Sequence, residues 1–135
     1  RGAIVNVGST AGLVGDYMLP VYSAMKGAVH AFTVVLAKEV GQHGVRVNAI
    51  APYATFATSP EAFSKGSRFH PDSNFFTSNP ETSKEEHRPF RQRMTFVGKP
   101  FATPEELACV VPLLASDRAS FVTGQIWPVD GGSLL

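Results

Sequence analysis

The stretch "AIVNVGSTAG", residues 3–12, decides the fold of this 135-residue chain. Its first five residues are nearly all apolar and mostly β-branched, a pattern typical of a short strand buried on both faces. The Gly, Ser and Thr residues at 8–12 that follow favour a loop. A buried strand that ends in a small-residue loop is typical of a sheet whose strands alternate with helices, so the segments downstream are read for that alternation.

A helix and a second strand follow this loop. From about Pro20 to Gly41 the spacing of apolar residues predicts a helix, and the glycines of "GQHG" (41–44) are stop signals. "VRVNAIA" (45–51) predicts a second strand, which Pro52 ends. Apolar residues three or four apart carry the helical pattern: Met25, Val29, Phe32, Leu36 and Val40.

The last third of the chain repeats this alternation. Residues 103–116 begin like a helix, with Thr103 as N-cap, and Pro112 should kink or interrupt that helix. "GQIWPVDGG" (124–132) predicts a strand and a glycine turn, and Pro128 places this strand at a sheet edge because proline cannot donate to the ladder. Residues 59–100 show no clear periodicity and are interpreted as a lid or binding loop.

Strands that alternate with helices predict an α/β fold, a parallel sheet with helices on both faces. Ligands bind such sheets beyond the carboxyl ends of the strands. This rule selects "GSTAG", "PYATFATS" (52–59) and "VDGG" (129–132). It also brings together Ser9, Tyr22 and Lys26, with the last two one helical turn apart.

This trio suits proton transfer at a carbonyl or alcohol oxygen. A free phenol holds its proton until about pH 10, and a neighbouring ammonium favours the phenolate. Tyr22 could then exchange a proton with the substrate while Ser9 holds the same oxygen. The hydride for such a reaction would have to come from a cofactor. The alternative is that Tyr22 and Lys26 form a surface pair with no catalytic role.

Composition narrows the function classes. The net charge is +1 and 44% of residues are hydrophobic, so we expect neither a nucleic-acid nor a membrane partner. The single Cys109 allows no internal disulfide and favours a reducing compartment, hence a cytoplasmic protein. We also expect Cys109 to lie in the core. No spacing predicts a metal site, and His30, within the helix, is interpreted as packed.

"IVNVGSTAG", Tyr22-Ser23-Ala24-Met25-Lys26, "GVRVNAIAP" and "TPEELACVVPLLASDRASFVTGQIWPVDGG" together resemble the C-terminal half of a short-chain dehydrogenase/reductase. The resemblance implies an NAD(P)-dependent oxidoreductase that interconverts a secondary alcohol and a ketone. It implies Tyr22 as general acid/base, Ser9 as the residue that orients substrate, and Lys26 as a ligand of the nicotinamide ribose. Tyr22 and Lys26, together with Pro52 and Thr55, match cofactor-binding positions, although Tyr53 replaces the family's usual glycine.

The same resemblance implies a three-layer, doubly wound Rossmann-type sheet, of which residues 1–135 are the C-terminal part and 59–100 the substrate loop. The family's glycine-rich cofactor half is then expected upstream of Arg1, so NAD and NADP cannot be distinguished, and the chain by itself should bind a dinucleotide poorly. A homo-oligomer, dimer or tetramer, is implied, with the helix at 22–40 and the edge formed by "TGQIWPVDGG" (123–132) as interface candidates. The alternative is a non-catalytic relative that serves as a binding or subunit-interaction protein.

Overall fold

The computed structural model describes residues 1–17, 19–56, 95–99 and 101–135, and within these it forms a parallel sheet of three strands in the order β1-β2-β3. Both strand pairs are parallel, which confirms the predicted α/β fold. The predicted lid at 59–100 lies outside the described residues except for 95–99. The elements in chain order are β1 (Gly2–Val7), α1 (Ala11–Val14), α2 (Pro20–Val40), η1 (Gly41–His43), β2 (Val45–Pro52), α5 (Pro104–Ala108), α6 (Val110–Ala115), η6 (Asp117–Ala119) and β3 (Ile126–Val129).

β2 is the central strand and the most buried part of the chain. Its register with β1 runs from Gly2 opposite Val45 to Val7 opposite Ile50. Val47, Ala49 and Ala51 of β2 are fully buried, as expected for a strand covered on both faces. β3 pairs only with β2 in the described sheet, and its Pro128 lies opposite Ala51. The predicted edge position of this strand is therefore confirmed.

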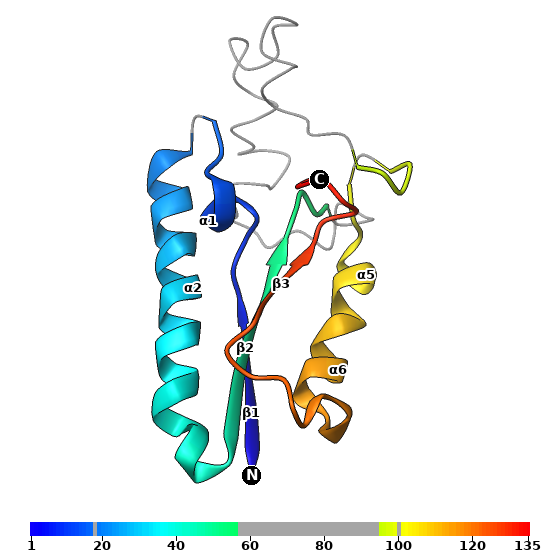
Figure 1. Ribbon diagram of the computed structural model, residues 1–135. Helices are drawn as coiled ribbons and strands as arrows, with labels where there is room; N and C mark the ends of the chain where they lie inside the picture. The colour runs from blue at the N-terminus through cyan, green and yellow to red at the C-terminus, as the bar shows by residue number, and fades with distance from the viewer. Residues whose placement is uncertain (18, 57–94, 100) are drawn as a thin grey trace, which may run out of the picture.

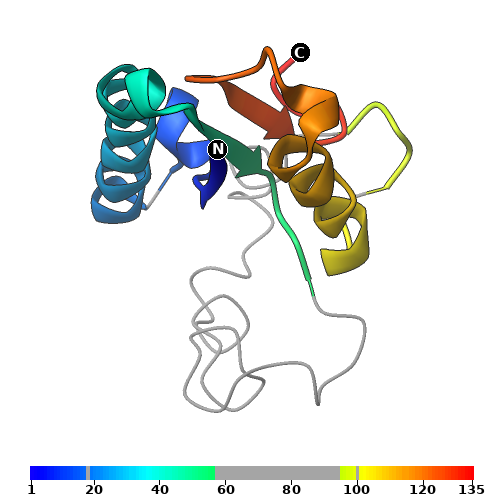
Figure 2. The ribbon, with the colours of Figure 1, turned by 90° about the horizontal axis from the view of Figure 1, so that it is seen from below.

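Helices cover both faces of the sheet, with α1 and α2 on one side and α5 and α6 on the other (Figures 1 and 2). α2 begins at Pro20 and ends before Gly41, as predicted. Its row of predicted apolar residues does not face the sheet as a single stripe, because Met25 and Phe32 are 64% and 57% exposed. The buried residues of α2 are His30, Thr33 and Ala37, which are small or polar.

The helix predicted at 103–116 is divided in two. Thr103 caps α5 in a capping box with Glu106, whose carboxylate accepts the Thr103 backbone N–H at 2.9 Å. The helix breaks at Cys109, three residues before Pro112, as expected because proline has no N–H to continue the i→i−4 ladder. Cys109 is exposed at this break, so its predicted core position was wrong.

Two side chains on β2 hold the last helices and β3 in place. Arg46 donates from Nη1 to the Leu114 carbonyl at 2.7 Å and from Nη2 to the Ser116 carbonyl at 2.9 Å. Asn48 is 1% exposed, donates to the Val122 carbonyl at 2.9 Å and accepts the Gln125 N–H at 3.1 Å. Asn48 is therefore a hydrogen-bonded scaffold residue.

Candidate active site

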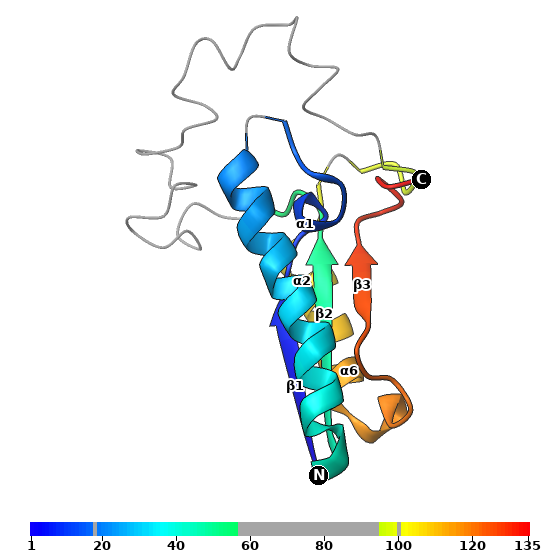
Figure 3. The same ribbon diagram turned by 60° about the vertical axis from the view of Figure 1, so that its left-hand side comes forward.

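The three strands point in the same direction, so their carboxyl ends meet at one end of the molecule, where α1 and the start of α2 also lie (Figures 1 and 3). The segment predicted as a loop at 8–12 runs into the short helix α1, which begins at Ala11, and Ser9 lies two residues before this helix. Tyr22 lies in the first turn of α2, and Pro52 ends β2. The parallel topology therefore gathers the predicted site residues at this end.

Tyr22 and Lys26 are neighbours on α2. The Lys26 ammonium nitrogen lies 5.8 Å from the centre of the Tyr22 ring, within the range of a cation–π contact. Lys26 also donates to the carbonyl oxygen of Val7 at 2.9 Å, which places the ammonium at the carboxyl end of β1. The Tyr22 side chain is 43% exposed and remains accessible. An accessible phenol beside a positioned cation is suited to proton exchange.

Ser9 is 8% exposed, and local hydrogen bonds fix its conformation. Its Oγ accepts the Ala11 N–H at 3.2 Å. Because a hydroxyl has one donor and two acceptor lone pairs, Ser9 keeps its O–H as a donor after this bond. Its own N–H donates to Nε2 of His30 at 3.4 Å. Ser9 is thus held from α2, the helix that also carries Tyr22 and Lys26.

His30 is the site residue that the sequence interpretation missed. Packing of this side chain was predicted and is confirmed, since it is 7% exposed. Its contact with Ser9 was not predicted, and the local sign of it in the sequence is the pair of glycines at 8 and 12, both of which lie against the ring. Burial lowers the pKa of His30, the Lys26 charge acts in the same direction, and the Gly12 backbone opposes both.

The segment after β2 carries the predicted cofactor positions Pro52 and Thr55. The Thr55 hydroxyl donates to the Tyr53 carbonyl at 2.8 Å. Backbone bonds on either side of Thr55 join Ala54 and Phe56 to Ala102, at 3.0 and 3.1 Å. The backbone N–H of Tyr53 donates to the Val129 carbonyl at 3.3 Å, which extends the pairing of β2 with β3. Main-chain contacts therefore hold residues 52–56, which form a rim at the carboxyl end of the sheet.

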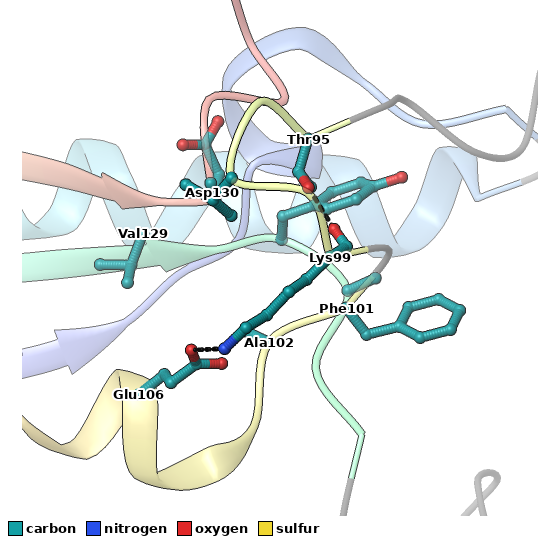
Figure 4. A pocket seen from close by; sticks show the side chains of 11 residues that line it. Thr95, Lys99, Phe101, Ala102, Glu106, Val129 and Asp130 are labelled. Atoms are coloured by element: carbon teal, nitrogen blue, oxygen red, sulfur yellow. Dashed lines mark hydrogen bonds and ion pairs between the residues drawn. The ribbon is translucent and has the colours of Figure 1, made fainter.

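A cavity of about 240 Å³ lies between this rim and the start of α5 (Figure 4). Inside it Lys99 reaches to the Glu106 carboxylate as an ion pair, which lowers the pKa of Glu106. Neither Ser9 nor Tyr22 nor Lys26 lines it, whereas Tyr53 and Ala54, which separate Pro52 from Thr55, both do. The lining residues are Tyr53, Ala54, Thr95, Val97, Lys99, Phe101, Ala102, Glu106, Val129, Asp130 and Gly131.

The turn after β3 lies beside this rim, and its Asp130 and Gly131 line the same cavity. Oδ1 of Asp130 accepts the Gly132 N–H at 3.0 Å, and Oδ2 accepts the Leu134 N–H at 3.0 Å. Gly131 and Gly132 have φ values of 59° and 83°, which favour glycine. The interpretation of residues 130–132 as a structural turn is confirmed.

Within residues 1–17, 19–56, 95–99 and 101–135, no group of three or more His, Cys, Asp or Glu side chains could hold a metal ion. No helix in the same part of the chain is long and apolar enough to cross a bilayer.

A model of the enoyl-(acyl carrier protein) reductase family matches residues 1–133. The structure is also similar to that of a short chain dehydrogenase from Mycobacterium paratuberculosis bound to NAD, with a TM-score of 0.71 and 30% identity over 98% of this chain. The chain belongs to the short-chain dehydrogenase/reductase family. Its three parallel strands correspond to the C-terminal half of that family's Rossmann-type sheet, and the resemblance stated from the sequence is confirmed.

Two curated members of the short-chain dehydrogenase/reductase family illustrate the range of relatives. An A-factor type gamma-butyrolactone 1'-reductase (1S-forming) from Streptomyces virginiae is 40% identical over 97% of this chain. An inactive 2-(S)-hydroxypropyl-CoM dehydrogenase 2 from Xanthobacter autotrophicus is 37% identical over 98% of it. The chain spans 44% and 51% of these two proteins, about half their length.

Proposed function

We propose that this protein is an NAD(P)-dependent oxidoreductase that interconverts a secondary alcohol and a ketone. The observation that carries the proposal is the position of Lys26, 5.8 Å from the Tyr22 ring and bonded to Val7 at the end of β1. That contact sets a phenol and a cation at the end of the sheet where ligands bind in this fold. Family membership supports the reaction class.

In the proposed reaction Tyr22 is the general acid/base. In the direction of reduction, its phenolic proton passes to the substrate carbonyl oxygen, and the nearby Lys26 cation stabilises the phenolate that remains. In the direction of oxidation, the proton returns from the alcohol to the phenolate. Ser9 donates its hydroxyl hydrogen to the same substrate oxygen and so orients the carbonyl.

Residues of this chain fit the nicotinamide end of the cofactor. The Lys26 ammonium has three N–H donors, of which the Val7 carbonyl takes one, so two remain for ribose hydroxyls. Tyr22 is exposed beside it, and the backbone at Pro52 and Thr55 lies at the same rim. The bound cofactor supplies or takes up the hydride. Both NAD and NADP stay within the proposal.

The proposal also includes the organisation and surroundings of the site. Residues 1–135 are the C-terminal part of one Rossmann-type domain, with 59–100 as a loop over a small-molecule substrate. A cytoplasmic location and the absence of nucleic-acid, metal and membrane partners remain part of it. We propose a homo-oligomer as well, supported by family membership and by exposed apolar side chains on α2 at Val21, Met25, Phe32 and Val35.

The test measures nicotinamide absorbance with NAD and NADP and a panel of secondary alcohols and ketones, using the complete protein. Tyr22→Phe should lower kcat by roughly 10²–10⁴-fold, the usual contribution of a general acid, and leave cofactor binding intact. Tyr17→Phe, which removes a hydroxyl from another exposed tyrosine, is the matched control. Turnover that survives in Tyr22→Phe would contradict the proposed role.

A second candidate function is a non-catalytic binding or subunit-interaction protein. Two observations favour it: a relative of 37% identity is named inactive, and Tyr53 stands beside the cavity at a position where the family usually has glycine. This alternative expects no turnover with any substrate in the panel and no change on Tyr53→Gly. Cofactor-dependent turnover in the wild type excludes it.

A further inference from the structure

The imidazole of His30 lies between two glycines that flank Ser9. A Cβ added to Gly8 would stand 2.1 Å from Nε2 of His30, and one added to Gly12 would stand 2.8 Å from Cε1. Real Cβ contacts essentially never fall below 3.0 Å, so a side chain at either position would displace the ring from its place against residues 8–12. His30 therefore occupies the inside of the turn that presents Ser9.

The ring also bonds to that turn. Nε2 of His30 accepts the Ser9 N–H at 3.4 Å, and both residues are more than nine-tenths buried. One turn earlier on the same helix, Lys26 bonds to Val7, two residues before Ser9. Tyr22, Lys26 and His30 thus follow one another at intervals of four along α2, and the last two attach the end of β1 and the Ser9 turn to the helix that carries Tyr22.

The bond from Ser9 requires a neutral ring. Nε2 can accept the Ser9 N–H only when the proton is on Nδ1, whereas an imidazolium would point a second donor at that N–H. Within the described part of the chain Nδ1 is buried and has no hydrogen-bond partner. In the same part of the chain the one charged group that acts on the ring is the Lys26 cation, which disfavours an imidazolium, and the one group that favours an imidazolium is the Gly12 backbone.

We propose that His30 is a positioning residue, whose neutral imidazole sets Ser9 relative to Tyr22, and that protonation of the ring releases the Ser9 turn. This inference rests on the oxidoreductase function proposed above. It predicts an activity that declines at acidic pH because Ser9 loses its orientation. Burial and the Lys26 charge, which lower the pKa of His30, keep the contact intact at neutral pH.

The experiment compares the complete wild-type protein with His30→Gln and His30→Leu. A glutamine amide oxygen can accept the Ser9 N–H at every pH, whereas leucine fills space without accepting. His43→Gln, at the exposed histidine of η1, is the matched control. kcat and KM are measured between about pH 5 and pH 9, a range that spans the titration of histidine. The NMR chemical shift of the Ser9 amide is followed over the same range.

In the wild type, the chemical shift of the Ser9 amide should change over the same acidic pH range in which kcat declines. His43→Gln should behave identically. His30→Leu should lower kcat roughly tenfold or more at every pH, with little change in cofactor affinity, since a misplaced orienting group slows the chemical step. His30→Gln should restore most of this kcat and abolish the acid-side decline and the titration of the amide.

An acid-side decline in kcat that persists unchanged in His30→Gln overturns the proposal, and so does a wild-type Ser9 amide whose shift does not respond to pH. The amide measurement needs no turnover. If the Ser9 amide titrates in the wild type and not in His30→Gln, but no substrate reacts, the contact is supported and the oxidoreductase function is what fails.

Discussion

The ammonium of Lys26 donates a 2.9 Å hydrogen bond to the carbonyl oxygen of Val7, and so joins the second turn of α2 to the carboxyl end of β1. The same ammonium lies over the Tyr22 ring. One cation therefore serves both the geometry of the site and its electrostatics. Removing the ammonium should therefore lower both kcat and the melting temperature.

Lys26→Met should lower kcat by roughly a hundredfold or more, because the phenolate of Tyr22 loses its stabilising charge. It should also weaken the attachment of α2 to β1 and lower the melting temperature slightly. Lys38→Met, which replaces an exposed lysine in the last turn of the same helix, is the control and should change neither kcat nor the melting temperature. Equal activity of the two variants would contradict the role assigned to Lys26.

His30 should make the stability of the protein depend on pH. Because its pKa is lowered in the folded state, the unfolded chain binds a proton first as the pH falls below about 6.5. The free energy of unfolding should therefore be fully retained above that pH and decline toward the lowered folded pKa. Urea unfolding at a series of pH values measures this slope. His30→Gln should reduce the pH dependence of the free energy of unfolding. A pH dependence equal to that of the wild type would contradict this prediction.

Arg46 should be important for stability although it lies outside the site. Arg46→Ala leaves the Leu114 and Ser116 carbonyls at the end of α6 without their charged donor. We expect a loss of about 1.5–3 kcal/mol, the range for hydrogen bonds to charged groups. Denaturant unfolding checks this, with a substitution of the exposed Arg118 of η6, Arg118→Ala, as control. A loss no larger than that of the control would show that these bonds contribute little.

Gly12 should tolerate no side chain. A Cβ there would stand 2.6 Å from the Lys26 carbonyl carbon and 2.7 Å from the Gly27 nitrogen, both backbone atoms of α2. Gly12→Ala should therefore push the helix away and cost about 1–3 kcal/mol. Gly41→Ala, with helical angles and nothing within 4 Å of its added Cβ, is expected to be neutral or mildly stabilising. Thermal melting of both variants separates the two expectations.

The exposed apolar side chains of α2 (Val21, Met25, Phe32 and Val35) should mediate self-association in the proposed homo-oligomer. Phe32→Glu places a charge among these side chains and should reduce the mass measured by light scattering. Phe121→Glu changes a phenylalanine that is 103% exposed near η6 and should leave the mass unchanged. If the mass of Phe32→Glu equals that of wild type, the interface lies elsewhere.

The sequence predicted elements whose signals are local. The limits of α2, the Thr103 cap and the break before Pro112 depend on neighbouring residues only, and all three are confirmed. Which face of α2 is buried was harder to infer, because the close approach at Gly12 selects small residues over the apolar row. The bond from Ser9 to His30 spans 21 positions in the chain, and its only local sign was the pair of glycines at 8 and 12.

The separation in sequence between bonded residues implies an order in which the elements fold. The backbone hydrogen bonds inside α2 are local, and its bonds to Val7 and Ser9 span 19 and 21 positions, whereas the bonds between Asn48 and the segment before β3 join residues 74 and 77 positions apart. Long loops close slowly because the chain loses entropy before the contacts form. β3 should consequently join the sheet last, and the Gln125 amide, which donates to Asn48, should be among the last to gain protection from hydrogen exchange during refolding.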